Sequence, residues 1–334
     1  MGPERRGSGT VSPIVLFAGL FLLLGGTALW RLLAGEMPVP FGAVLGILSG
    51  DVSGASPQEI AVVRLVRLPR LFAAFGAGAS LAVSGVVLQG LLGNPLAEPY
   101  TLGVAAGAAL GASVGIHLGG VWLPGAAFAG ALGALALSIS LSRRSGGGSP
   151  AHMVLAGIVV SSFLSAAVTL LKSLADEKLS SIVFWLMGGF SGATPEGALC
   201  VCVSSAVLLA AALWWARDLD AMSLGERRGT YLGVDERNVR GCLLALASLA
   251  TALAVSFHGI IGFVGLIGPH LLRMLLGPSH RKLLAASFLG GALLLSVADG
   301  AARAMNELPV GVITSFIGGP VFCWILVRER AGRT

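Results

Sequence analysis

The sequence has 334 residues, of which 55% are hydrophobic and only 11% are charged, and its mean hydropathy is +0.87. About a quarter of the residues of a soluble domain are charged, so this composition excludes an ordinary soluble protein and predicts a surface that largely faces lipid. The net charge is +6, but the basic residues are scattered between apolar runs rather than gathered on one face. No nucleic-acid partner is therefore expected.

Apolar runs long enough to cross a bilayer recur along the whole chain, because a spanning helix needs about 20 apolar residues. The uncharged run 99–142 is too long for one helix, so the turn sequence HLGGVWLPG at 117–125 is expected to divide it. The stretches SRRSGGGSP and HGIIGFVGLIGP indicate a loop and a bend. The predicted fold is all-α and polytopic, with spans near 11–31, 70–92, two within 99–142, 151–171, 197–215, two within 241–276, 283–303 and 309–327.

The segments between these spans are more polar or more broken. KSLADEKLSS is polar, and the IVFWLMGGFSGATPEG that follows is apolar but interrupted by glycines, which predicts a partial or interfacial element. GPSHRK indicates a turn before the ninth span, and a charged segment fills 217–240 between the sixth and seventh spans. The chain is expected to form a single transmembrane domain over 1–334.

The distribution of Lys and Arg predicts the orientation of these spans. With the N-terminus in the cytoplasm and the spans alternating, 15 of the 22 basic residues fall on the cytoplasmic side, in keeping with the excess of basic residues in cytoplasmic loops. Both termini are then cytoplasmic, and the protein is expected in the cytoplasmic membrane.

The stretch RLVRLPR departs from this rule, because it places Arg64, Arg67 and Arg70 together on the opposite side. One interpretation is an anchor whose long side chains reach the interface. The other is an extracytoplasmic basic patch that receives an acidic partner, which Arg303 at the end of the ninth span could join. Asp299 lies four residues before Arg303, and a helical ion pair between these two is expected.

The chemistry of an enzyme or of an ion-coupled carrier is not visible. The sequence has no GxxxxGK[ST] phosphate loop and no HExxH motif, so neither a catalytic site nor a cofactor or metal is expected in this chain. Coupling to an ion gradient is not indicated, since Asp299 and Arg273 are the main ionisable residues inside the spans. Energy is therefore expected from a separate ATPase.

The charged segment 217–240 suits such a partner. Leu and Tyr residues alternate there with charges and with Gly225, Gly229 and Gly233. Short helices broken by these glycines would lie at the membrane face and present apolar side chains to a groove on another protein. A plain solvated loop is the alternative, but it would not need Leu and Tyr at these places.

Four stretches resemble the FecCD family, the membrane subunits of ATP-binding cassette (ABC) importers for iron–siderophore complexes, haem and cobalamin. They are RLPRLFAAFGAGASLAVSGVVLQGLLGNPLAEPYTLGVAAGA (67–108), FWLMGGFSGAT (184–194), LGERRGTYLGVD (224–235) and GIIGFVGLIGPHLLRMLLGPSHRKLLAASFLGGALLLSVADGAAR (259–303), which continues into ELPVGVITSFIGGPVF (307–322). The resemblance covers nearly the whole chain after the first span.

The resemblance implies the type II importer permease fold, with an inverted repeat, in a homodimer around a central path. Two cytoplasmic ATP-binding subunits would dock on the loop at about 217–238, and an extracytoplasmic substrate-binding protein would dock on arginines at Arg67, Arg70 and Arg303; Arg64 has no counterpart. Asn94 and Leu96 in NPLAEP match the cytoplasmic gate. The residues implied in ATPase coupling are Leu224, Gly225, Glu226, Tyr231, Leu232, Gly233 and Val234.

The cargo that this family resemblance favours is an iron(III)–siderophore chelate, with cobalamin or haem as alternatives and a secondary transporter as a more remote one. Gly157, Ser161, Ser162 and Ser165 lie near one face of the fifth span and would suit a wide path for a bulky chelate. Ordinary helix packing explains these small residues equally well.

Overall fold

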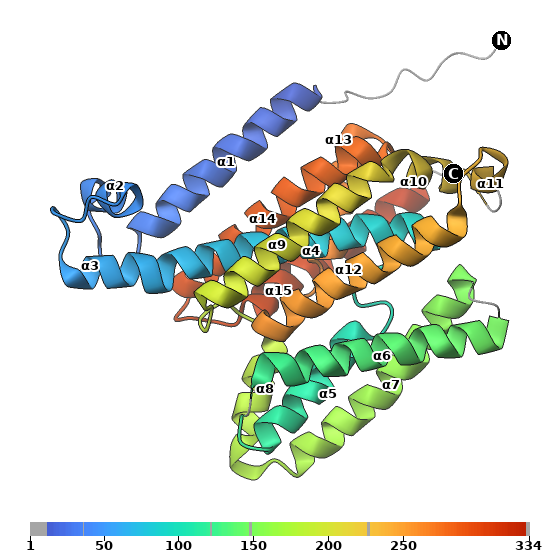
Figure 1. Ribbon diagram of the computed structural model, residues 1–334, viewed down its shortest axis with the longest axis horizontal. Helices are drawn as coiled ribbons and strands as arrows, with labels where there is room; N and C mark the ends of the chain where they lie inside the picture. Colours follow the sequence, from blue (N-terminus) through green and yellow to red (C-terminus); the bar gives the residue numbers. More distant parts are fainter. Residues whose placement is uncertain (1–11, 36, 121, 147–148, 226–227, 332–334) are drawn as a thin grey trace.

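The computed structural model describes residues 12–35, 37–120, 122–146, 149–225 and 228–331, and these residues form a bundle of helices (Figure 1). In chain order the helices are α1 (Pro13–Leu33), α2 (Phe41–Ser49), α3 (Pro57–Ala61), the π-helical turn η1 (Val62–Arg67), α4 (Leu68–Leu92), α5 (Val104–His117), α6 (Leu123–Gly146), α7 (Pro150–Ser173), the 3-10 turn η2 (Asp176–Lys178), α8 (Leu179–Met187), α9 (Pro195–Trp214), α10 (Ala216–Met222), α11 (Arg228–Tyr231), α12 (Glu236–His258), α13 (Val264–Leu276), α14 (His280–Ala304) and α15 (Val310–Ala331).

Ten apolar helices match the ten predicted spans. Seven described segments are long and apolar enough to cross a bilayer: α1, the continuous helix through α3, η1 and α4, then α6, α7, α9, α12 and α14. The shorter apolar helices α5, α13 and α15 supply the remaining three. The predicted division at 117–125 is confirmed, because α5 ends at His117 and α6 begins at Leu123.

Three boundaries differ from the sequence prediction. The predicted loop at 142–150 is shorter, because α6 continues through Arg143 and Arg144 to Gly146. The predicted turn GPSHRK ends early, since α14 begins at His280. The helices α2 and α3 were not predicted at all, and α3 is built by a capping box in which Ser56 and Glu59 exchange hydrogen bonds.

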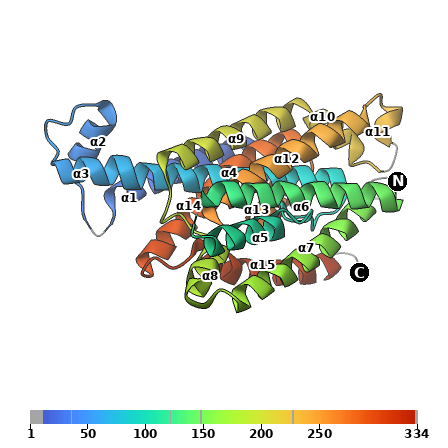
Figure 2. The ribbon, with the colours of Figure 1, turned by 60° about the horizontal axis from the view of Figure 1, so that its bottom comes forward.

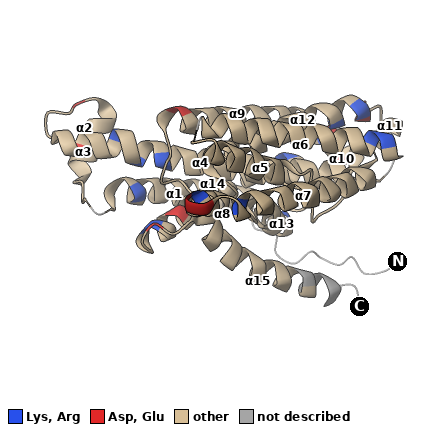
Figure 3. Cartoon of the chain, turned by 90° about the horizontal axis from the view of Figure 1, so that it is seen from below, with Lys and Arg blue, Asp and Glu red and all other residues tan. Residues whose placement is uncertain are grey.

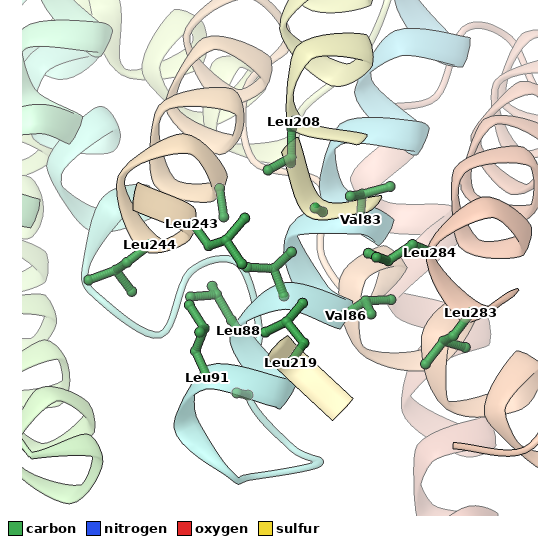
Figure 4. Close-up of a cluster of buried hydrophobic side chains, with 14 of the residues drawn as sticks. Val83, Val86, Leu88, Leu91, Leu208, Leu219, Leu243, Leu244, Leu283 and Leu284 are labelled. Carbon is green, nitrogen blue, oxygen red and sulfur yellow. The ribbon is translucent and has the colours of Figure 1, made fainter. Parts of the chain in front are cut away.

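Helix α4 lies at the centre of the bundle and is buried along almost its whole length. Its Val83, Val86, Leu88 and Leu91 interdigitate with leucines of α9, α10, α12 and α14 (Figure 4). Close approach is possible because Gly78 of α4 faces the backbone of Gly291 of α14, where a larger side chain would not fit. Helix α1 is the opposite case, since it lies at the periphery and contacts mainly α14.

The helices group into two sets joined through α12. Helices α5, α6, α7 and α8 lie together beside the set formed by α4, α9, α12, α13 and α14 (Figures 1 and 2). Helix α12 contacts α4 and α9 in one set and α5 and α6 in the other.

The same order of a long helix, a bend and a short helix occurs twice along the chain. The bend 93–103 joins α4 to α5, and the bend 259–263 joins α12 to α13. Each short helix begins directly after a residue with left-handed backbone, Gly103 with φ of 83° and Phe263 with φ of 69°. The two bends meet, because the Tyr100 hydroxyl donates a 2.8 Å hydrogen bond to the carbonyl of Ile261. Discontinuous helices of this kind line transport paths in membrane proteins.

Candidate functional site

Charged side chains gather at the two ends of the bundle. One end, here named the arginine end, holds the end of α1, the turn η1, the start of α4 and the end of α14. The other, named the coupling end, holds α10, α11, the end of α4 and the starts of α7 and α12. Figure 3 shows basic residues near the start of α4 at one end and near α11 at the other. The sequence-predicted site residues divide between these two ends.

Asp299 of α14 lies at the centre of an ion cluster at the arginine end. Its side chain is fully buried and pairs with Arg31 of α1 and with Arg70 of α4. Arg70 reaches both carboxylate oxygens, with its Nε 2.9 Å from Oδ2 and its Nη2 2.9 Å from Oδ1. The predicted pair between Asp299 and Arg303 is therefore wrong, because two arginines from other helices already satisfy this carboxylate.

Glu307 accepts two further hydrogen bonds from the guanidinium of Arg70. Arg70 donates from Nη1 to Oε1 at 2.9 Å and from Nη2 to Oε2 at 2.7 Å, a bidentate contact. These hydrogen bonds hold the pKa of Glu307, which lies after α14, below its usual range. The contribution of this contact to stability is therefore complete above the ordinary glutamate pKa. It is lost as the pH falls from there to the lowered pKa, because the carboxylate then takes up a proton. Sequence analysis did not single out Glu307, and its distance from Arg70 along the chain left no local signal.

Arg67 serves the backbone rather than an acidic group. Its guanidinium donates to the carbonyls of Leu32 and Leu33 at the end of α1 and to the carbonyl of Met37 in the segment that follows. These carbonyls lie at the negative end of the α1 dipole, so a buried cation is well placed there. Arg67 is thus a cap that fixes α1 against the start of α4.

The exposure of the predicted docking arginines differs from what their proposed role requires. Arg67 and Arg70 are only 3% and 7% exposed, and both are engaged within the chain. The side chain of Arg303 is 22% exposed, and its Nε lies 3.8 Å from Oε1 of Glu307. Arg64 is exposed. Arg67 and Arg70 therefore present no free guanidinium group, whereas Arg303 keeps an accessible side chain. The docking role of the three arginines stays a prediction.

The predicted gate residues lie in the bend 93–103 at the coupling end. Asn94 closes a turn by accepting a 2.9 Å hydrogen bond from the backbone N–H of Leu96. Asn94 lines a cavity of about 690 Å³ between the end of α4, the start of α7 and α12. Asn94 and Leu96 together line a second cavity of about 400 Å³ with Ser161 and Ser162 of α7. The role of the two residues as a gate stays a prediction.

Gln89 fixes this bend to the rest of the bundle, and sequence analysis missed it. Its side-chain amide donates to the carbonyls of Ala97 at 3.4 Å and Gly265 at 3.3 Å, and its oxygen accepts from Arg273 at 3.0 Å. Nearby, burial raises the pKa of Glu98, which favours its neutral form. One buried amide therefore connects α4, the bend and α13.

The small residues predicted on α7 have two different roles. Ser161 and Ser165 line a third cavity, of about 390 Å³, with Tyr100 and alanines of α5. Tyr100 and Ser161 line both this cavity and the 400 Å³ cavity, so the two adjoin along one face of α7. Gly157 is instead buried against the backbone of Thr101, where it allows close packing. The hydroxyls thus line the hollow face, and the glycine belongs to the core.

The predicted coupling segment consists of two short helices, as the glycines indicated. Tyr231 is 87% exposed, Leu232 is 63% exposed and Leu224 is 57% exposed, so three apolar side chains do face outwards. Gly225 and Gly233 are exposed turn residues, and Val234 packs partly against the core. Glu226 lies outside the described residues.

A contact from α10 ties the coupling segment to α14. Asp220 accepts hydrogen bonds from the backbone N–H of His280 at 2.9 Å and from its ring Nδ1 at 2.6 Å. At the other side of the segment, Glu236 accepts from the backbone of Thr230 at 3.0 Å. These contacts therefore tie the segment to both α12 and α14. Sequence analysis did not find this connection, because its partners lie 60 residues apart.

The apolar helices, the cavities along α7 and the broken helices beside them fit a multi-pass membrane transport protein. The chain belongs to the FecCD transport family, whose model matches residues 20–328. It is thus an ABC importer permease subunit of the metal-chelate type, a class that works with ATPase and substrate-binding partners.

Individual relatives agree with this assignment. The chain is 44% identical to the cobalamin import system permease protein BtuC of Halobacterium salinarum, over 89% of this chain and 87% of the relative. It is 36% identical to the hemin transport system permease protein HmuU of Yersinia pestis, over 98% and 99%. A solved structure of an inward-facing metal-chelate type ABC transporter superposes with a TM-score of 0.83 at 36% identity, over 95% of this chain and 100% of that one, which shows the type II importer permease fold.

Proposed function

We propose that two copies of this chain enclose a path for an intact metal chelate, here an iron(III)–siderophore complex. The observation that carries this proposal is the hollow face of α7, where two adjoining cavities of about 400 and 390 Å³ are lined mainly by hydroxyls and apolar side chains, with Glu98 in one and Lys172 in the other as the ionisable members. A bulky chelate needs width and few strong ligands, since tight binding inside the path would slow its release. The second copy would close this face.

Cobalamin is a second candidate cargo, favoured by the name of the 44% identical relative. Uptake into vesicles that hold this permease, its ATPase and its binding protein distinguishes the candidates. Radioiron-labelled ferrichrome is expected to accumulate when ATP is supplied on the side of the vesicle membrane that carries the ATPase. Radiocobalt-labelled cyanocobalamin and haem are expected not to accumulate under the same conditions. Accumulation of cyanocobalamin alone would replace the iron chelate as cargo, and accumulation without ATP would contradict the importer mechanism.

We propose further that the arginine end faces outwards and receives acidic residues of the substrate-binding protein. The ion cluster contains four arginines, Arg31, Arg67, Arg70 and Arg303, against two carboxylates, so a surplus of positive charge remains there. Arg303 would make the direct contact. Arg70 would contribute by exchange, because an incoming carboxylate competes with the half-exposed Glu307 for the same guanidinium.

The two variants Arg303→Glu and Glu307→Gln test this docking role. We expect Arg303→Glu to weaken binding-protein affinity about tenfold through charge repulsion, and Glu307→Gln to tighten it about threefold by releasing Arg70. Surface plasmon resonance on the reconstituted permease measures both. Lys178→Glu, a charge reversal outside the ion cluster, is the control and should leave the affinity unchanged.

Two results would contradict the docking proposal: equal loss of affinity in Lys178→Glu and Arg303→Glu, or no change in either Arg303→Glu or Glu307→Gln. A variant with both Arg67 and Arg70 changed to glutamate would not test docking alone. It would place new carboxylates against Asp299 and against the carbonyls that end α1.

The coupling end would then face the cytoplasm, with the ATPase on the exposed side chains of α11 and its neighbours. The contacts of Asp220 with His280 and of Glu236 with Thr230 support this proposal, since they connect the segment to the starts of two spanning helices.

A further inference from the structure

An apolar groove at the arginine end is separate from the ion cluster and from the hollow face of α7. It lies between the start of α4 and the start of α9 and has a volume of about 380 Å³. This α4–α9 groove is lined by Arg64, Leu68, Pro69, Phe72, Pro195, Ala198, Leu199 and Cys202. Arg64 is the only charged member of this set, and neither the family resemblance nor the ion cluster uses it.

The spacing of the lining residues gives the groove its direction. Arg64, Leu68 and Phe72 lie four residues apart on one face of η1 and α4, and the α9 residues also recur at helical spacing. The groove therefore runs from Arg64 at the mouth towards Phe72, over about 12 Å at 1.5 Å per residue. It ends where the Cys202 thiol lies 3.2 Å from the carbonyl of Phe72.

The apolar wall of the groove is open on the outside of the bundle. Phe72 is the one exposed residue of the otherwise buried helix α4, and Leu199 opposite it is 65% exposed. In a membrane protein such a wall lies against acyl chains, which are as apolar as leucine side chains. The length and lining of the α4–α9 groove suit the upper part of one acyl chain.

Arg64 places a positive charge at the mouth of the α4–α9 groove, where a phospholipid would carry its phosphate. Arg67 and Arg70 turn into the bundle, whereas the Arg64 side chain stays at the surface and donates only a 3.3 Å hydrogen bond to the carbonyl of Ile47. Among the residues that the structure describes, Arg64 has no ion-pair partner. A guanidinium at headgroup level beside an apolar groove is complementary to a lipid phosphate.

We propose that the α4–α9 groove binds one phospholipid with an anionic headgroup, its phosphate on Arg64 and one acyl chain along Phe72 and Leu199. The bound lipid would brace α9 against the start of α4, beside the helices that hold the ion cluster. This inference does not depend on the proposed cargo or on the docking role of Arg303.

Native mass spectrometry of the purified full chain, titrated with phosphatidylglycerol and separately with phosphatidylcholine, tests the proposal. We expect one tightly retained phosphatidylglycerol per chain. Arg64→Gln should weaken its apparent affinity about fivefold and abolish the preference over phosphatidylcholine. Leu199→Trp, which fills the groove from an exposed position, should weaken both lipids alike.

Two matched controls fix the location. Val207→Trp changes an exposed position two turns further along α9, and Lys178→Gln removes a surface charge at the same end of the bundle. Both should retain phosphatidylglycerol as the unchanged chain does. Displacement of the lipid by glycerol phosphate alone would overturn the proposal, because the groove would then contribute nothing.

Unchanged lipid retention in both Arg64→Gln and Leu199→Trp would also overturn it. If those variants instead lower the dimer fraction in the same spectra, the groove is an interface between two copies. If they lower only the affinity of the binding protein, Arg64 belongs to the docking surface. Either result replaces the lipid as occupant.

Discussion

Asp299→Asn is expected to lower the midpoint of thermal unfolding of the purified protein by about 5–10 °C. Asp299 is fully buried between Arg31 and Arg70, and the neutral amide would leave Arg31 buried without a counter-charge. Breaking a buried pair by removing one partner costs about 3–5 kcal/mol. The loss of helical circular dichroism on heating measures the midpoint.

Two further variants show whether the effect comes from the buried charge. Glu307→Gln changes a half-exposed carboxylate on the same arginine and should shift the midpoint by no more than about 2 °C. Arg31→Met added to Asp299→Asn removes the unpaired charge and should recover part of the loss. An Asp299→Asn protein as stable as the unchanged chain would show that the ion cluster does not hold α1 and α14 together.

Tyr231→Asp is expected to reduce ATP-driven uptake more than tenfold, because an exposed aromatic side chain that enters a partner's groove carries much of the binding energy. The change places a charge where the proposed ATPase contact is apolar. Uptake into vesicles and co-purification of the ATPase with the permease measure the effect. The unfolding midpoint of the permease alone should not change, since Tyr231 makes little contact with the rest of the chain.

The control for this experiment is Leu118→Asp, which introduces the same charge at an exposed leucine near the arginine end. It should leave ATPase co-purification intact. A Tyr231→Asp complex that assembles fully and hydrolyses ATP with normal stimulation would place the ATPase elsewhere on the coupling end.

The spans could be predicted because lipid imposes a length and a composition on each helix separately. The break between α5 and α6 and the bend before α13 followed from glycines and prolines for the same reason, since these residues act locally. The helices α2 and α3 escaped prediction because they are too short to cross a bilayer, and the search was for spans. The capping box of Ser56 and Glu59 was a local signal for the start of α3 that sequence analysis did not use.

The candidate site was predictable in its residues but not in its pairings. The arginine-rich start of α4 was visible, yet the partners of Arg70 and of Arg31 lie 229 and 268 residues away from them. Helical spacing favoured the local pair between Asp299 and Arg303, and the close packing of α1, α4 and α14 overrode it. Gln89 escaped for the same reason, because its role depends on backbone carbonyls from two other segments.

The pairing of Arg31 with Asp299 also constrains how the protein is made. During synthesis at about 5–20 residues per second, α1 enters the membrane tens of seconds before α14 exists. During that interval Arg31 cannot pair with Asp299. Because Arg31 lies in the last turn of α1, its side chain can stay hydrated at the membrane interface until then. Asp299 arrives after both Arg31 and Arg70, and its insertion joins the first helix of the chain to a helix made near the end of synthesis.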